Sequence, residues 1–153
     1  MDYEKVSDLK DILEECFATD LDLLNRYHIE APAILSTCVK RTYDDLMACD
    51  DIVFYKVFEN NNLIGYFCKE KDKYDNKYLT GFFLKPVYRK SEYVKRFWDI
   101  VDKEIGEDYL IGLYEKNSRA VKFVERGGGE VFFRGVDDKG NGFVSYKMKI
   151  SCQ

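Results

Sequence analysis

The sequence predicts an α+β domain with a mixed, mostly antiparallel central sheet and helices on both faces. Three patterns support this prediction: a hairpin near the middle of the chain, a strand–helix–strand–helix unit after it, and a second hairpin near the end. The strand–helix–strand unit requires two near-parallel strands with a crossover helix, whereas hairpins require antiparallel neighbours. At 153 residues, the chain is most simply one domain, residues 1–153.

The first third of the chain is predicted to be helical. Apolar residues at helical spacing indicate helices at 6–17 and 20–27, and a third helix that begins at Ser36 or Thr37. Pro32 separates the second helix from the third, because the residue before a proline is pushed out of the α region. Few residues precede the first helix, so a first strand at the N-terminus is expected to be shortened or absent.

The middle of the chain changes to a strand pattern. Residues 52–58 and 63–68 are predicted to form a hairpin, with asparagines between them that suit a turn with positive φ. The central unit follows, with a strand at 77–84, a turn at 85–90, a helix at 91–105 and a strand at 109–114. One face of that helix is apolar at helical spacing and is expected to be buried: Val94, Phe97, Trp98, Val101 and Ile105. A helix from Asn117 or Ser118 then runs to the glycines 127–129, and strands at 129–135 and 143–150 form the last hairpin. That hairpin is a natural place for strand-mediated contact between two copies.

The central unit also carries a family resemblance. The segment 84–90, Leu-Lys-Pro-Val-Tyr-Arg-Lys, and the segment 114–128 resemble the GNAT superfamily of N-acetyltransferases. That family has a V-x-P-x-[YF]-R-x-x-G-x-G/A turn that holds coenzyme A, followed by an N-x-x-A-x-x-[FL]-Y-x-x-x-G helix. The residues in register are Pro86, Tyr88, Arg89, Asn117, Ala120 and Gly128. The resemblance implies a GNAT-like fold and transfer of an acetyl (acyl) group from acetyl-CoA to an amine of a small molecule or protein.

The resemblance implies a coenzyme A site at the start of the helix at 91–105. Main-chain N–H groups and the helix dipole favour a pyrophosphate there. Glu92 and Val94 replace the two glycines of the motif, and an acid in the first turn also stabilises a helix without any ligand. Asn117 contacts the pantetheine arm in the family, or caps the helix. The implied cofactor-binding residues are Phe83, Leu84, Arg89, Lys90, Ser91, Glu92, Val94 and Asn117.

The catalytic positions depart further from the family. The tyrosine that commonly protonates the leaving thiolate aligns with Val124, which cannot donate a proton. Tyr114, at the end of the preceding strand, is the nearest replacement, although it also fits as a strand-end aromatic. The central strand contains no acid that could act as a base, and the nearest acids precede it, at Glu70, Asp72 and Asp75.

Two functions therefore stay open. The first is an acetyl-CoA-dependent N-acetyltransferase, and the second is a catalytically inactive GNAT-fold protein that acts as a binding, inhibitory or assembly component. The net charge of −4 argues against nucleic acid and makes a cationic acceptor or protein partner more plausible. The sequence contains no C-x-x-C pair and a single histidine, His28, so no metal site is expected. A cytoplasmic protein without a membrane segment, either monomer or homodimer, is the default expectation.

Overall fold

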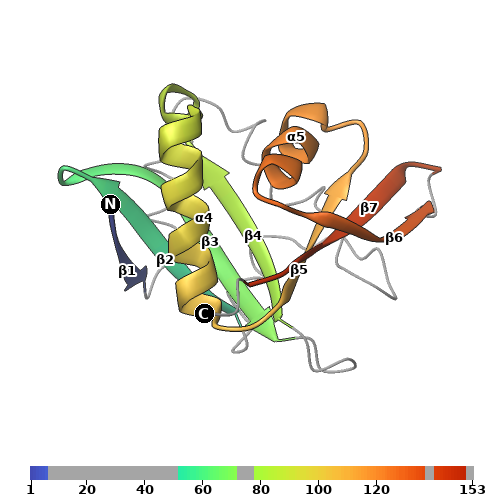
Figure 1. The fold of residues 1–153 in the computed structure, drawn as a ribbon, viewed down its shortest axis with the longest axis horizontal. Coiled ribbons are helices and arrows are strands. Elements are labelled where there is room, and N and C mark those ends of the chain that lie inside the picture. Colours follow the sequence, from blue (N-terminus) through green and yellow to red (C-terminus); the bar gives the residue numbers. More distant parts are fainter. Residues whose placement is uncertain (7–51, 72–77, 137–139, 151–153) are drawn as a thin grey trace.

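The computed structural model describes residues 1–6, 52–71, 78–136 and 140–150 of the chain (Figure 1). Its strands are β1 (Asp2–Val6), β2 (Ile52–Glu59), β3 (Asn62–Lys71), β4 (Tyr78–Leu84), β5 (Tyr109–Tyr114), β6 (Glu130–Val136) and β7 (Gly142–Met148). Its helices are the 3-10 turn η1 (Pro86–Tyr88), α4 (Ser91–Ile105) and α5 (Ser118–Arg126). The helices predicted at 20–27 and after Ser36, and almost all of the one at 6–17, lie outside the described residues.

The described strands form one mixed sheet in the order β1-β2-β3-β4-β5-β7-β6. All neighbouring strands are antiparallel except β4 and β5, which are parallel. The single parallel pair arises because α4 carries the chain from the end of β4 back to the start of β5. The predicted mixed, mostly antiparallel α+β architecture is confirmed.

The N-terminal strand decides between the two expected alternatives: the first strand is present and short. A first strand is present, and its five residues pair antiparallel with β2 from Asp2↔Phe58 to Val6↔Phe54. Tyr3 anchors it, because its ring lies 5.9 Å from the rings of both Tyr55 and Phe67 and its hydroxyl donates to Glu104 at 3.2 Å. The sequence pattern predicts this strand poorly, because its polar residues face outward and too few residues alternate between polar and apolar to indicate a strand.

The buried core lies between the sheet and the two long described helices. Helix α4 buries the predicted face, Val94, Phe97, Trp98, Val101 and Ile105. These side chains pack against sheet residues that include Val57, Ile64, Phe67, Leu84, Ile111, Val144, Tyr146 and Met148. In Figure 1, α4 crosses in front of β2–β4, and α5 lies on the same side of the sheet near β5. Both helices therefore cover one face.

The β2–β3 turn confirms the reading of its asparagines and gives a first prediction. Asn60 and Asn61 have φ values of 50° and 66°, as a two-residue hairpin turn with left-handed residues requires. We expect Asn61→Ala to lower the free energy of unfolding by about 1 kcal/mol, because alanine tolerates this region poorly. Asn61→Gly should match or exceed the wild type in the same denaturant titration, and equal losses in both variants would contradict the turn assignment.

Candidate cofactor and active site

The candidate site lies where the two parallel strands separate. β4 and β5 pair only at Tyr78↔Tyr109 and Leu79↔Leu110, and the remaining residues of the two strands have no mutual register. On its other edge β5 stays paired with β7 along its whole length. The strands consequently diverge toward the end at which α4 begins (Figure 1). Beyond Leu79, the edge of β4 that faces β5 therefore has no strand partner among the described residues.

Hydrogen bonds hold the end of β4 both to β3 and to the turn that follows it. Its last residue, Leu84, pairs with Gly65 of β3, and the Lys85 N–H donates to the Ile64 carbonyl at 2.7 Å. The Nε–H of Arg89 donates to the Leu84 carbonyl oxygen at 2.6 Å. Its guanidinium carbon lies 5.4 Å from the Phe83 ring centroid. Arg89 thus holds the turn against the strand, and the Leu84 carbonyl already accepts a hydrogen bond.

The start of α4 presents a set of main-chain donors. The residue before it, Lys90, is extended and forms no side-chain cap, and its carbonyl accepts from the Tyr93 and Val94 amides at 3.0 and 2.9 Å. Within the described ranges, the amides of Ser91 and Glu92 form no hydrogen bond, and the Glu92 carboxylate caps neither of them. Lys90, Ser91 and Glu92 are all exposed. The donors of an anion site are therefore present, with a carboxylate of unfavourable charge beside them.

The second replaced glycine has a different environment. Val94 is buried and belongs to the core cluster that also contains Leu84. Its side chain consequently points toward the sheet and away from the exposed first turn. Of the two departures from the family turn, only Glu92 places an unfavourable group at the helix start.

Aromatic rings fill the interior between β4, α4 and α5. Phe82 of β4 stacks on Phe123 of α5 with centroids 5.0 Å apart and planes inclined by 14°. Trp98 of α4 lies 5.3 Å from each of these rings, and Phe97 lies 6.0 Å from Phe123. The sequence reading assigned Phe97 and Trp98 to the core but missed Phe82 and Phe123.

The far end of β5 carries the candidate acid. Tyr114 is 8% exposed, pairs with Phe143 of β7, and has the Lys116 ammonium 5.4 Å from its ring centroid. Tyr109 and Ile111 belong to the core on the α4 side. Since side chains alternate along a strand, Tyr114 faces the opposite side of the sheet from α4.

Two positions of the second motif have structural roles. The Asn117 side-chain oxygen accepts from the Ala120 amide at 3.3 Å, so this residue caps α5 as its sequence position predicts. Val124, at the motif's tyrosine position, is fully buried. The structure thus brings Phe83, Leu84, Arg89 and Lys90–Glu92 together around the end of β4, and separates Val94 and Val124 from that surface.

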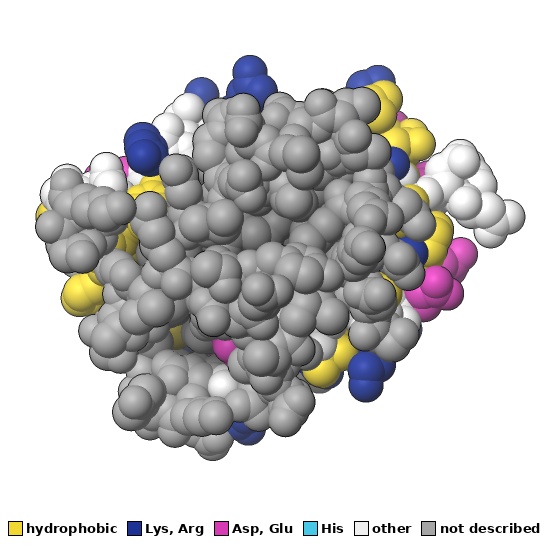
Figure 2. All heavy atoms as spheres, turned by 180° about the vertical axis from the view of Figure 1, so that it is seen from behind, with side chains coloured by type: hydrophobic (Ala, Val, Ile, Leu, Met, Phe, Trp, Pro, Cys, Tyr) yellow, Lys and Arg dark blue, Asp and Glu magenta, His cyan; other side chains and the backbone are white. Residues whose placement is uncertain are grey.

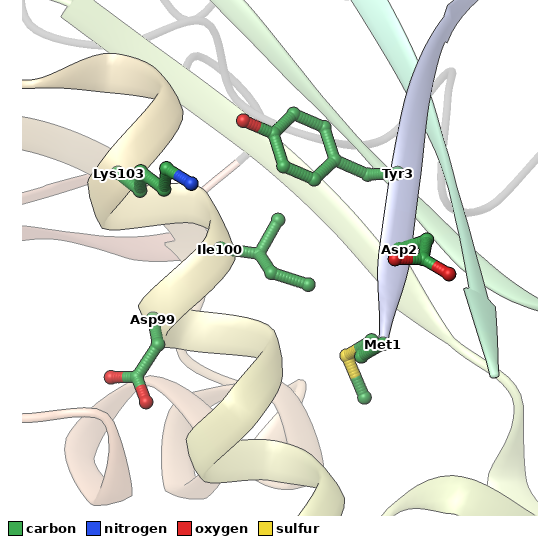
Figure 3. Close-up of a pocket in the computed structure, with 6 residues that line it drawn as sticks. All are labelled: Met1, Asp2, Tyr3, Asp99, Ile100 and Lys103. Atoms are coloured by element: carbon green, nitrogen blue, oxygen red, sulfur yellow. The ribbon is translucent and has the colours of Figure 1, made fainter.

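A groove between β1 and α4 has no residue in common with the candidate site. It has a volume of about 320 Å³ and lies between β1 and α4, lined by Met1, Asp2, Tyr3, Asp99, Ile100 and Lys103 (Figure 3). In Figure 1, α4 lies between β1, which borders this groove, and β5. Among the described residues, no group of three or more His, Cys, Asp or Glu side chains could hold a metal ion. Likewise, none of the described helices is long and apolar enough to cross a membrane.

Comparisons with known proteins agree on the architecture. No family model matches the chain, and no curated protein matches it in sequence. Solved structures do match: smu.2055 from Streptococcus mutans has a TM-score of 0.67 and 15% identity, over 97% of this chain and 99% of its own. A variant of spermidine N-acetyltransferase SpeG from Vibrio cholerae has a TM-score of 0.64 and 12% identity, over 97% and 95%. YncA from Salmonella typhimurium, solved with its cofactor acetyl-CoA, has a TM-score of 0.62 and 13% identity, over 99% and 95%. The chain therefore has the fold of the GNAT N-acetyltransferases.

Proposed function

We propose that this protein is a GNAT-like N-acetyltransferase, which transfers an acetyl group from acetyl-CoA to an amine. The observation that carries the proposal is the divergence of β4 from β5 beside the amides at the start of α4, which have no hydrogen bond to any other described residue. Together these would offer main-chain groups to a pantetheine arm and donors to a pyrophosphate. Lys90 adds a positive charge at the same point.

Two chemical roles are assigned to residues of this chain, one at the thioester oxygen and one at the leaving thiolate. Acetyl-CoA, when bound, would supply a thioester as the acetyl donor, and a main-chain N–H of β4 would donate to its carbonyl oxygen. Tyr114 is the proposed acid for the leaving thiolate, since it lies at the end of β5 where the strands diverge. A cationic acceptor is favoured by the net charge of −4, and SpeG, a structural neighbour, is a spermidine N-acetyltransferase.

A second candidate function rests on three residues whose identity or contacts do not suit cofactor binding and catalysis as in the family. Glu92 is exposed at the anion site, Arg89 is bonded to the strand it follows, and Val124 removes the usual acid. These features suit a GNAT-fold protein that no longer catalyses transfer and acts as a binding, inhibitory or assembly component. Coenzyme A affinity separates the two candidates.

The test is isothermal titration of acetyl-CoA into the wild type and Glu92→Gln. If the start of α4 binds the pyrophosphate, removal of this carboxylate should tighten binding about tenfold, because it repels the phosphates at close range. Asp99→Asn removes one exposed charge from the same helix, away from its start, and should leave the affinity unchanged.

Two outcomes would reject the N-acetyltransferase proposal. One is an absence of binding by both the wild type and Glu92→Gln at millimolar ligand. The other is binding that is indifferent to Glu92, since the cofactor would then lie elsewhere. Either result would favour the binding-component function.

A further inference from the structure

The strands β4 and β5 separate although neither has a bulge against its outer neighbour. β4 keeps one continuous register with β3, and β5 keeps one continuous register with β7. The register shifts of the described sheet lie elsewhere, between β2 and β3 and between β6 and β7. Two parallel strands that begin to pair normally continue, because each further residue pair satisfies main-chain N–H and C=O groups. Since no irregularity of either backbone explains the separation, its cause is sought in the side chains.

A pair of stacked rings joins the two separated parts of the sheet. Continued in the register of its two existing pairs, β5 would set Leu113 beside Phe82 of β4. Phe82 instead carries the ring of Phe123, 5.0 Å away and inclined by 14°. Phe123 lies in α5, which follows β5 directly along the chain. The stack lies on the face of the sheet that carries α4 and α5 (Figure 1), and Figure 2 shows the molecule from behind that face.

The stack limits how closely β5 can approach β4. Rings at this spacing are already in van der Waals contact, so β5 and α5 cannot move toward β4 while both rings are in place. The buried Trp98 of α4 supports the stack, with its ring 5.3 Å from each of the two. On another side this indole meets the end of α5, since a Cβ at Gly127 would lie 2.6 Å from its Nε1. The stack therefore cannot move toward α4 without displacing a buried ring.

We propose that Phe82, Phe123 and Trp98 form an aromatic wedge that holds β4 and β5 apart, so that the opening at the candidate site exists before any ligand binds. An opening formed in advance reduces the free energy that binding must spend on rearrangement. Phe82 and Phe123 are thus positioning residues, which act through the spacing of the strands. The inference rests on the proposed function only for the identity of the ligand, acetyl-CoA, because the spacing is a property of the fold.

The first experiment measures hydrogen exchange by NMR on the protein without ligand. Phe82→Leu removes one flat ring, so the strands should pair further, and amides within residues 80–84 and 111–114 should gain about tenfold protection. Phe82→Tyr keeps the ring and should exchange as the wild type does. Circular dichroism should show both variants folded. Unchanged or reduced protection in Phe82→Leu would overturn the proposal.

Phe67→Leu is the matched control for the loss of a stacked ring. Phe67 stacks on Tyr55 with almost the same geometry, 4.8 Å between centroids and 13° between planes. These two rings belong to the neighbouring strands β3 and β2, which are paired throughout, so their contact does not join β4 to α5. Exchange in residues 80–84 and 111–114 should therefore stay as in the wild type. An equal gain of protection in Phe67→Leu would attribute the effect to aromatic packing in general and refute the wedge.

A second experiment connects the wedge to the ligand. In isothermal titration, Phe82→Leu should bind acetyl-CoA about tenfold more weakly than the wild type, because its opening has partly closed. Phe82→Tyr and Phe67→Leu should retain the wild-type affinity. Equal affinity of the wild type and Phe82→Leu would contradict the role of the wedge in keeping the site open. A wild type that does not bind acetyl-CoA would instead count against the N-acetyltransferase function, while hydrogen exchange still decides whether the wedge holds the strands apart.

Discussion

Gly65→Ala should lower the free energy of unfolding by about 3 kcal/mol, since it forces β3 and β4 apart at the candidate site. A Cβ at Gly65 would clash with the Phe83 carbonyl oxygen and would lie 3.0 Å from the Leu84 Cα. Both are backbone atoms, so no side chain can rotate away. The strand end that must move also accepts the Arg89 hydrogen bond, and the geometry around the start of α4 should change with it.

Gly81→Ala is the matched control for this prediction. Gly81 lies in the same strand pair, opposite Cys68, and an added Cβ would meet only the Cys68 Sγ, at 3.2 Å. We expect a loss of less than about 1.5 kcal/mol, because that contact can relax. Urea unfolding followed by tryptophan fluorescence measures both variants. Similar losses of unfolding free energy in the two variants would show that the backbone contacts at Gly65 do not cause the instability.

The central unit could be predicted in detail because its signals are local. The apolar period of 91–105 and the aromatic run before it depend only on neighbouring residues, and α4 and β5 have the predicted bounds. Asn117 likewise caps α5 through a residue three positions along the chain. Elements whose residue pattern and geometry both depend on neighbouring residues can be predicted from the sequence alone.

The arrangement of the candidate site could not be predicted, because it depends on contacts between distant segments. The stack of Phe82 on Phe123 joins a strand to a helix far along the chain, and no local pattern pairs these two residues. The resemblance implies that Arg89 binds the cofactor, whereas in the structure its side chain donates to the Leu84 carbonyl after the chain turns back. Val94 is buried because α4 packs its apolar face against the sheet. The helical periodicity indicates this burial, whereas the motif comparison treats position 94 only as a replaced glycine.

The other large effect is expected at the contact that joins the later part of α4 to the first residue of β5. The buried Tyr109 hydroxyl donates to the Asp102 Oδ1 at 2.6 Å. Tyr109→Phe should cost about 2–3 kcal/mol near pH 7, because a partly buried carboxylate loses its donor. Tyr146→Phe is the matched control: this buried tyrosine donates to Glu125, an exposed residue, at 2.9 Å, so its loss should cost about 1 kcal/mol or less.

The pH dependence of that loss gives the sharper test. Burial raises the pKa of Asp102 above its ordinary value, while the Tyr109 hydrogen bond lowers the pKa. A carboxyl with a raised folded-state pKa contributes stability below its unfolded value, which is lost as the pH rises through the folded value. Without the Tyr109 hydroxyl the pKa of Asp102 rises further, so the deficit of Tyr109→Phe should be small near pH 4 and grow toward pH 7. Denaturant titrations at both pH values measure it, and a deficit independent of pH would mean that lost packing, rather than the unpaired carboxylate, causes the instability.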